Sequence, residues 1–326
     1  MGAVVEMVSQ VPKAGFGNQE ELASRWARTL RSYVAYLRAA RGMSENTVEA
    51  YSHDVALLRD YLLNEEPVGP GEVTQSHLES LLTELGRDDL LGVRSQARVL
   101  SGWRSFFRYM ALEQAMERDP TELLDSPKQG SYLPDFLEEQ EVDAMEQSID
   151  LSQPQGPRNL AIIETLYSCG LRVSELCALR LSQIERGDGV IRVIGKGNKE
   201  RLVPIGEQAL HAIDNYLPIR AAGRLLPEAG DTLFISRTGL GIRRVMVFLI
   251  VRRAAEAAGI QKKVTPHTLR HSFATSLVRG GADLRVVQAM LGHASIVTTE
   301  LYTHLTQDDM RQAVARFHPR GQAKRE

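Results

Sequence analysis

A break at residues 125–135 is the feature that most limits how this chain can fold. The segment DSPKQGSYLPD puts two prolines and a glycine between two long stretches of regular patterning. Proline lacks the amide hydrogen that a helix needs, and glycine adds conformational freedom, so helical patterning stops here. A chain of 326 residues is long enough for two domains, each with its own core. We therefore predict an interdomain linker at residues 127–134.

The first half of the chain carries only helical patterning. We expect residues 1–20, which show no periodicity, to form a flexible N-terminal extension. From Glu21 onward apolar residues recur at helical spacing, and no strand pattern appears before residue 128. In the SQARVLSGWRSFFRYM segment one helical stripe is formed by Val99, Trp103, Phe106 and Met110. Residues 21–126 are therefore predicted to form an all-helical domain.

The opposite side of the same segment is basic. It carries Arg94, Arg98, Arg104 and Arg108. A row of guanidinium groups could follow the phosphates of a DNA backbone. An ordinary exposed helix face would have the same pattern, so the row leaves both interpretations open.

The second half mixes helical patterns with short strands. Val190–Ile194 and Arg201–Ile205 are typical of two strands, and GKGNKE joins them. The LFIS segment at 233–236 resembles another short strand. We predict that residues 135–326 form a mostly helical α+β domain with a small antiparallel sheet, so that the whole chain is mainly α with two domains.

Charge is distributed unevenly in this half. The whole chain has 39 Lys and Arg against 41 Asp and Glu, a formal net charge of −2, which does not by itself indicate a nucleic-acid-binding protein. Between residues 237 and 272, however, eight basic residues face one acidic residue, Glu256. Phosphate binding needs a local field rather than a total charge, so we expect Arg243 and Arg244 in this strip to contact DNA. Paired arginines are also common on solvated helix faces.

Cysteine content and apolar runs limit the class of protein. Cys169 and Cys177 are the only cysteines, which argues against a disulfide framework or a cysteine-rich metal site. The first residues lack the basic and apolar regions of a signal peptide, and the apolar run Val245–Val251 is too short to cross a bilayer. We expect a cytoplasmic protein.

One C-terminal stretch, from HTLRH to TTELYTH, concentrates side chains that suit phosphate chemistry. His267 and Arg270 are three residues apart, so on a helix they lie on neighbouring turns of one face and can reach one phosphate. His293 follows Gly292, a residue typical of a helix end. Tyr302 adds a phenol that could act as a nucleophile.

Each of these residues also has an ordinary structural explanation. A lone histidine is usually a hydrogen-bonded surface or core residue, and a lone tyrosine usually packs its ring. His271 shares a helix side with Ala274 and Val278, so we expect it to be structural and buried. A zinc site on His267 and His271 is disfavoured, because Thr268 stands where a metalloprotease carries glutamate.

Two cations further upstream belong to the candidate set. Arg172 follows Gly170, a typical helix stop, and precedes Ser174, a good N-cap, so we expect a sharp turn between two helices. Lys196 lies at the glycine-flanked tip of the hairpin IRVIGKGNKERLVPI, although such a tip alone is usually a solubilising turn. GKGNKER is not a P-loop, since it lacks the spacing and the Lys-Ser/Thr ending.

Together these motifs resemble the active-site set of the tyrosine recombinases, the phage integrase family. The six matching residues are Arg172 in GLRVSEL, Lys196 in GKGNKER, His267 and Arg270 in HTLRH, His293 in LGH, and Tyr302. Their order and flanking words look most like the bacterial Xer site-specific recombinases, and the resemblance extends over nearly the whole chain from about Glu21. The chain departs from the pattern at Ser276, where many relatives carry histidine, at Cys169, where threonine or serine is commoner, and in its extended N-terminal tail.

The resemblance implies an enzyme that breaks and rejoins DNA strands without a metal, ATP or another cofactor. Tyr302 would form a 3′-phosphotyrosyl intermediate, and Lys196 would protonate the departing 5′ oxygen. Arg172 and Arg270 would grip the non-bridging oxygens, because a planar guanidinium binds phosphate bidentately. The histidines would add hydrogen bonds, and His267 could also move the proton of the nucleophile.

The resemblance also implies an architecture and partners. A SAM-like core-binding domain and a catalytic domain would clamp a double-stranded recombination site. Four protomers of one or two related recombinases would exchange strands through a Holliday junction, in some cases with a DNA translocase as activator. The segment 307–317 would form a helix that docks on a neighbouring protomer, or else simply caps its own domain. Such enzymes resolve chromosome dimers at cell division.

Other functions remain open at this point. The chain could be the integrase of a mobile element or a plasmid resolution recombinase, and the C-type, D-type and single-Xer roles look alike. Outside the recombinases, a type IB-like topoisomerase shares a tyrosine and cations, but the GKGNKER hairpin and GADLRVVQAMLGH favour a recombinase. A DNA-binding protein without catalysis would normally lack one of the six residues.

Overall fold

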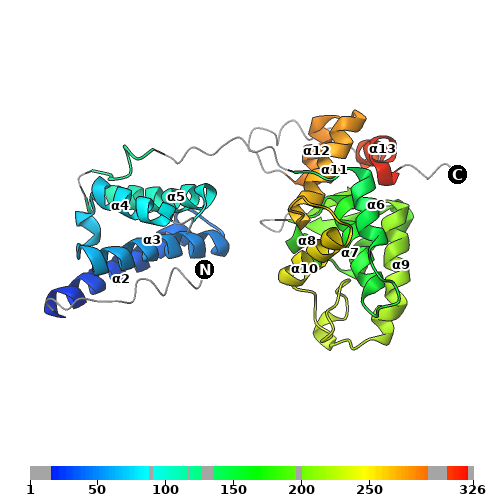
Figure 1. Cartoon of the computed structure of the whole chain (residues 1–326), viewed down its shortest axis with the longest axis horizontal. Helices are drawn as coiled ribbons and strands as arrows, with labels where there is room; N and C mark the ends of the chain where they lie inside the picture. Colours follow the sequence, from blue (N-terminus) through cyan, green and yellow to red (C-terminus); the bar gives the residue numbers. More distant parts are fainter. Residues whose placement is uncertain are drawn as a thin grey trace. The chain divides into compact units, whose positions relative to one another are not determined.

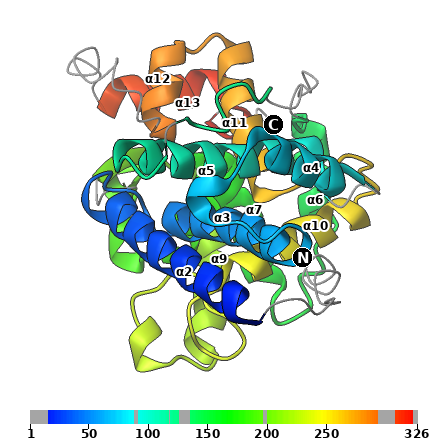
Figure 2. The same ribbon diagram turned by 90° about the vertical axis from the view of Figure 1, so that its left-hand side faces the viewer.

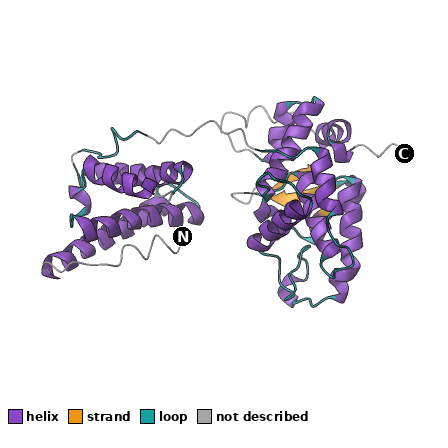
Figure 3. Cartoon of the chain, in the orientation of Figure 1, coloured by secondary structure: helices purple, strands orange, loops and turns teal. Residues whose placement is uncertain are grey.

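The computed structural model describes residues 16–87, 91–116, 118–125, 135–195, 200–292 and 307–321. The chain divides into two compact units, Met1–Tyr132 and Leu133–Glu326, and each is described by itself. Over the described ranges both units are mainly helical, and strands occur only in the second (Figure 3). The predicted fold class, mainly α with a small antiparallel sheet, is confirmed. The predicted linker at 127–134 is not among the described residues.

Four long helices build the described part of the N-terminal unit (Figure 1). They are α2 (Phe16–Ala39), α3 (Glu45–Glu65), α4 (Gln75–Gly86) and α5 (Val93–Leu112), with the 3-10 turn η2 at Pro70–Glu72. Helix α3 contacts each of the other three. Helix α2 begins within residues 1–20, so the expectation of a flexible extension is wrong from Phe16 onward. Residues 18–21 of α2 are polar and Leu22 is buried, so residues 1–20 hold too little of the helix to show a periodic pattern.

Aromatic side chains from α2 and α5 fill the core of this unit. Figure 2 shows the ribbon of α3 between those of α2 and α5. Trp26, Tyr33, Trp103 and Phe106 are fully buried, and the Tyr33 ring meets Phe106 edge-on with centroids 5.2 Å apart. Burying a large apolar side chain contributes about 1.5–3 kcal/mol. The predicted apolar stripe of α5 is confirmed, because it faces this core.

The crossing of α3 and α5 depends on a buried carboxylate. Asp54 is fully buried, and its Oδ2 accepts a hydrogen bond of 2.6 Å from Arg98. Its backbone carbonyl accepts a second bond, of 2.8 Å, from Trp103 Nε1. Burial raises the pKa of Asp54, and the hydrogen bond from Arg98 opposes that rise. Gly102 permits the approach of the two helices, because a Cβ at this position would lie 2.7 Å from Asp54 Oδ2.

We predict that Gly102→Ala destabilises the N-terminal unit by about 1–3 kcal/mol, because overpacking at Asp54 outweighs the gain of about 1 kcal/mol in helix propensity. Both tryptophans of the chain, Trp26 and Trp103, lie in this unit, so tryptophan fluorescence during urea unfolding reports on it alone. Ser101→Ala, at the exposed neighbouring position, is the matched control. Equal midpoints for the two variants would contradict the prediction.

The described C-terminal unit packs helices around one buried helix and a small sheet (Figure 1). Its helices are α6 (Glu139–Gln147), α7 (Gly156–Cys169), α8 (Val173–Ala178), α9 (Glu207–Ala222), α10 (Arg244–Ala257), α11 (Pro266–Gly280), α12 (Leu284–Leu291) and α13 (Gln307–Phe317). The 3-10 turns are η4 (Leu181–Gln183), η5 (Arg186–Asp188), η7 (Pro227–Ala229) and η9 (Pro319–Gly321). Within the described ranges, no helix is both long enough and apolar enough to cross a bilayer.

The sheet has three antiparallel strands in the order β1–β2–β3, namely Ile184–Glu185, Val190–Ile194 and Glu200–Pro204. Ile191 pairs with Val203, which confirms the predicted hairpin to within one residue at each end of its second strand. Strand β1 was not predicted, because two residues are too few to show alternation. The predicted strand at 233–236 is wrong: this segment makes a single bridge, between Ile235 and Gly241, and its apolar residues are buried in the helical core instead.

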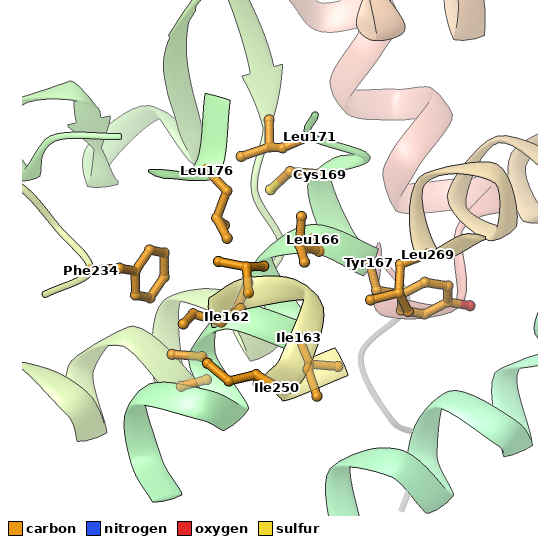
Figure 4. Packing of buried hydrophobic residues seen from close by; sticks show 14 of the residues in the cluster. Ile162, Ile163, Leu166, Tyr167, Cys169, Leu171, Leu176, Phe234, Ile250 and Leu269 are labelled. Atoms are coloured by element: carbon orange, nitrogen blue, oxygen red, sulfur yellow. The ribbon is translucent and has the colours of Figure 1, made fainter. Parts of the chain in front are cut away.

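Helix α7 forms the centre of the core (Figure 4). Ile162, Ile163 and Leu166 on α7 are fully buried, and side chains from other elements, among them Phe234, Ile250 and Leu269, surround the helix. The helix ends at Gly170, which has a left-handed φ of 58°. A Cβ on Gly170 would lie 2.3 Å from the Phe273 ring, so only glycine allows α11 to pack this close to the turn.

A buried arginine holds the end of the chain against α6 and α7. Arg320, in η9, is 4% exposed. Its guanidinium lies 2.6 Å from Asp143, 3.0 Å from Glu146 and 3.1 Å from Glu164, with Glu139 at 3.9 Å. Burial raises the pKa of Glu146, and the neighbouring Glu164 adds to the rise, while Arg320 opposes it. The turn η9, which follows α13, is therefore fixed to α6 and α7.

Helix α13 also packs on its own unit, against α11 and α12. Its Val314 and Ala313 are buried there with Phe273 and Met290. The resemblance implied that this helix docks on a neighbouring protomer. Within the single chain α13 caps its own domain, and docking on a neighbouring protomer stays a prediction.

The buried His318 makes this C-terminal anchor sensitive to acid. Burial lowers the pKa of His318 to about 3, and Arg320 adds to the shift. The unfolded chain would titrate this imidazole near pH 6.5, so it binds a proton that the folded state does not as the pH falls from about 6.5 towards 3. The contribution of His318 to stability is therefore complete above about pH 6.5 and is lost as the pH falls.

We predict that His318→Gln makes the stability of the protein less dependent on pH between 6.5 and 4.5, by about 1.4 kcal/mol per pH unit. Calorimetric unfolding over this range measures the slope. His211→Gln, on the exposed side of α9, is the control and should keep the slope of the parent protein. A variant at His318 with the parental slope would contradict the prediction, whatever its absolute stability.

Candidate active site

Arg172 lies in the turn between α7 and α8. It follows the left-handed Gly170 by two residues and is the N-cap of α8. Helix α8 begins at Val173, two residues before the start expected with Ser174 as the cap, because the carboxylate of Glu175 accepts the Arg172 backbone N–H at 2.8 Å. The sharp turn predicted between two helices is present, but Ser174 is not its cap.

Arg270 comes from the second turn of α11 and is 7% exposed. Its guanidinium donates to the carbonyl of Gly170 at 2.7 Å and to the carbonyl of Leu291 at 2.5 Å. Burial lowers the pKa of Arg270 to about 10, with Arg172 adding to the shift, so the group stays protonated at neutral pH. The structure therefore places a buried cation beside the Arg172 turn.

The C-terminal end of α12 is held by three arginines. Arg201 Nε donates to the Met290 carbonyl at 2.8 Å, Arg270 to Leu291, and Arg172 Nη2 to Gly292 at 2.9 Å. Cations suit this end of a helix, where carbonyls lack intrahelical partners. Gly292 ends α12 with a φ of 63°, as the sequence predicted. Segments more than a hundred residues apart are thus joined at one point.

A single buried carboxylate connects the same arginines. Glu175 accepts hydrogen bonds of 2.8 and 2.9 Å from Arg201 and one of 2.8 Å from Arg172 Nη1, and it lies 3.8 Å from Arg270 Nη1. Burial raises the pKa of Glu175, but the bonds from Arg201 and Arg172 outweigh burial and leave that pKa below its ordinary value. Glu175 is therefore ionised and offsets the mutual repulsion of the guanidinium groups.

Arg172 and Arg270 keep hydrogen-bond donors for a ligand. On the described residues, each guanidinium uses two of its five N–H groups. Both line a cavity of about 760 Å³, and His267, exposed in the first turn of α11, lines the same cavity. The three side chains that the sequence grouped around a phosphate therefore share one opening. Two guanidinium groups and an imidazole suit an anionic phosphate better than a neutral ligand.

His271 lines this cavity too and is half-buried rather than fully buried as expected. Burial lowers its pKa, and His267 adds to the shift, so the imidazole is neutral near pH 7. Among the residues that the structure describes, no group of three or more His, Cys, Asp or Glu side chains could hold a metal ion.

Three of the six candidate residues, Lys196, His293 and Tyr302, fall on residues 196–199 and 293–306, which the structure does not describe. Their attachment points are described. Strand β2 ends at Ile194 and β3 begins at Glu200, while Gly292 immediately precedes His293. The assignment of these three residues remains a prediction.

The predicted DNA-binding arginines have different surroundings. On α5, Arg94 and Arg108 are exposed, whereas Arg98 is paired with buried Asp54, and Arg104 donates to the Leu124 carbonyl at 2.5 Å. Arg98 and Arg104 thus also stabilise their own unit. Arg243 and Arg244 are exposed at the start of α10. DNA contact by these six residues stays a prediction.

Two residues of this site were not singled out in the sequence. Glu175 had a local signal, because a glutamate three residues after a helix N-cap is typical of a capping box. Arg201 had none. It reads as an ordinary strand residue, and its contacts with Glu175 and Met290, 26 and 89 residues away, exist only in the folded chain.

We predict that Arg201→Gln loosens α12 and lowers the free energy of unfolding by about 2–4 kcal/mol. The loss is smaller than for a buried carboxylate that has no cation left beside it, because Arg172 still pairs with Glu175. Hydrogen exchange followed by mass spectrometry should show faster exchange at Leu284–Leu291. Arg192→Gln, which removes an exposed arginine on the neighbouring strand, is the matched control. Unchanged exchange of α12 in the Arg201 variant would refute the role of this contact.

Family models and known proteins match nearly the whole chain. The Phage integrase family matches residues 135–309, and the phage integrase N-terminal SAM-like domain matches residues 30–114. The tyrosine recombinase XerD of Pseudomonas putida is 43% identical over 281 residues, which cover 86% of this chain and 94% of the relative. XerD of Listeria monocytogenes is 38% identical over 293 residues, covering 89% of this chain and 98% of the relative.

Solved structures share the fold. A XerH recombinase bound to its difH substrate aligns with a TM-score of 0.62 at 21% identity, covering 88% of this chain and 94% of that one. A lambda integrase dimer bound to a core site aligns with a TM-score of 0.66 at 20% identity, covering 86% and 98%. The family matches and the XerD relatives, together with this shared fold, show that the chain belongs to the phage integrase family, the tyrosine recombinases.

Proposed function

We propose that this protein is a site-specific recombinase in which Arg172, Lys196, His267, Arg270 and His293 assist strand cleavage by Tyr302. As a tyrosine recombinase it breaks and rejoins DNA strands. One observation supports the residue assignment: Arg172 and Arg270 line the same cavity as His267. Both guanidinium groups keep N–H donors that no described residue uses. They also bind the carbonyls of Gly292 and Leu291 at the end of α12, next to His293. Cations gathered at one opening fit a phosphodiester.

The guanidinium groups act on the phosphate. Arg172 and Arg270 bind its two non-bridging oxygens, and they bind more strongly as negative charge develops during attack. Glu175 keeps both groups oriented without reaching the cavity itself, since its oxygens are occupied by Arg172 and Arg201. Most of the catalytic advantage therefore comes from charge that is already positioned before DNA binds.

The covalent step exchanges one phosphoester for another. The Tyr302 oxygen attacks phosphorus, the bond from phosphorus to the 5′ oxygen breaks, and Lys196 gives that oxygen a proton. His267 takes the phenol proton, because a phenol with a pKa of about 10 is largely protonated at neutral pH. The 3′-phosphotyrosine retains the energy of the phosphodiester, so the 5′ hydroxyl of a second strand can attack it and no ATP is needed.

DNA at a recombination site is the proposed partner, and chromosome dimer resolution the proposed role. The XerD names of the relatives support this role over that of a mobile-element integrase. The neighbouring XerH structure, which is bound to difH, supports a duplex recombination site. On paired sites, four protomers of one or two related recombinases assemble into a tetramer, with or without a DNA translocase as activator. The DNA on which they act is in the cytoplasm.

We expect wild-type protein to form a covalent adduct with DNA and Tyr302→Phe to form none. Genomic DNA from the source organism is incubated with the protein, treated with SDS, and the DNA attached to protein is sequenced. A nicked suicide duplex carrying the recovered site then gives the adduct yield on a gel. Tyr36→Phe, in the N-terminal unit, is the matched control and should react like the parent.

The adduct experiment also separates the proposed roles. Recovered DNA from one chromosomal focus supports dimer resolution, and DNA from scattered element ends indicates an integrase. The absence of any SDS-resistant adduct with wild-type protein, or an undiminished adduct with Tyr302→Phe, would refute the proposed chemistry.

A further inference from the structure

The proposed chemistry gives no role to His271, although this histidine lines the cavity of Arg172, His267 and Arg270. Its side chain is half-buried, and no residue that the structure describes forms a hydrogen bond with it. A histidine that serves only packing normally has its ring nitrogens satisfied within the fold. His271 therefore keeps its hydrogen-bonding capacity for the cavity.

His267 and His271 are neighbours on one face of α11. They are four residues apart, so their Cβ atoms lie about 5–6 Å from each other. Arg270, three residues from His267, is the other neighbour one turn further along the helix. A guanidinium group has only donors, whereas a neutral imidazole has one acceptor. Within this turn of α11, which the structure describes completely, only the His271 side chain can therefore accept a hydrogen bond from the N–H of His267.

The surroundings of His271 keep its imidazole neutral. Burial lowers its pKa, and His267 adds to the shift. The other charged side chains lining the described part of the cavity are all cations, namely Arg172, Arg270 and Arg279. Helices α8, α10 and α12 line it with uncharged side chains. Since no described carboxylate in the cavity stabilises a proton on His271, its acceptor nitrogen is available at neutral pH.

His267 needs such an acceptor for the role assigned to it. It lies in the first turn of α11, is exposed, and has no hydrogen bond to a described residue. To take the phenol proton, one ring nitrogen must face Tyr302 with its lone pair while the other carries the hydrogen. An acceptor at the second nitrogen fixes this tautomer and the orientation of the ring, as the carboxylate does in a Ser-His-Asp triad.

We propose that His271 is a positioning residue for His267, accepting a hydrogen bond from one ring nitrogen so that the other takes the proton of Tyr302. The inference rests on the proposed function, in which Tyr302 is the nucleophile. During cleavage the phenol proton moves to His267, which becomes cationic, and it returns to the Tyr302 oxygen when the strand is rejoined. His271 stays neutral throughout. The structure has no hydrogen bond between the two imidazoles, and the exposed ring of His267 turns to form it when the phosphate binds.

Variants at His271 separate positioning from DNA binding. The probe is the nicked suicide duplex that carries the site recovered from the Tyr302 adduct. His271→Phe keeps a ring but removes both nitrogens, so adduct formation at saturating duplex should slow about tenfold, as for the loss of one hydrogen bond, while the Kd for the duplex stays unchanged. His271→Gln, whose amide oxygen can accept the same bond, should recover most of the rate.

A double-mutant cycle tests whether His271 acts through His267. In a His267→Ala background, His271→Phe should cause no further loss of rate, because the group that it positions is already absent. Thr275→Val is the matched control, since Thr275 lies one turn further along α11, is half-buried and lines the same cavity. This variant should form the adduct at the parental rate.

Three outcomes would overturn the inference and leave the proposed function standing. They are a parental rate in His271→Phe, an equal slowing by His271→Phe with and without His267, and a rate for His271→Gln as low as that for His271→Phe. Circular dichroism checks the fold, and His271→Leu replaces His271→Phe throughout if the larger ring disturbs it. Absence of the adduct with wild-type protein would instead count against the proposed function.

Discussion

The carboxylate of Glu175 is the group on which the candidate site depends. It is buried, ionised and bonded to both Arg172 and Arg201, with Arg270 3.8 Å away. Three guanidinium groups this close would repel one another in a protein interior, and removing their shared anion would leave them without compensation. Because the same arginines also bind the carbonyls at the end of α12, one carboxylate fixes the relation of α8, β3, α11 and α12.

The buried cluster around Arg320 performs a similar task at the end of the chain. Four carboxylates from α6 and α7 surround it, so the turn η9 is attached to the centre of its own unit. The described neighbours of residues 293–306 are both anchored: Gly292 is held by Arg172, and α13 packs on its own unit.

Local rather than total charge explains how a chain with a net charge of −2 can bind DNA. Arg243, Arg244 and Arg253 at α10 lack side-chain partners among the described residues, whereas other cations are neutralised within the fold, as Arg98 is by Asp54 and Arg252 by Glu256. A count of charges in the sequence does not distinguish these cases, because pairing is a property of the folded chain. This difference makes α10 a stronger candidate for DNA contact than the row on α5.

The sequence by itself predicted the mainly helical fold and the β2–β3 hairpin, because both depend on local periodicity. It also predicted the ends of α7 and α12, because glycine favours the left-handed conformation found there. The order of the short motifs was enough to indicate the family. The sequence also grouped Arg172, His267 and Arg270, which line one cavity in the structure, although their catalytic roles stay a prediction. It could not identify Arg201, the single bridge at Ile235 or the attachment of α13, since each depends on contacts between distant segments. Tertiary structure alone decided which arginines are neutralised and which face a ligand, because burial and ion pairing arise only when those segments meet.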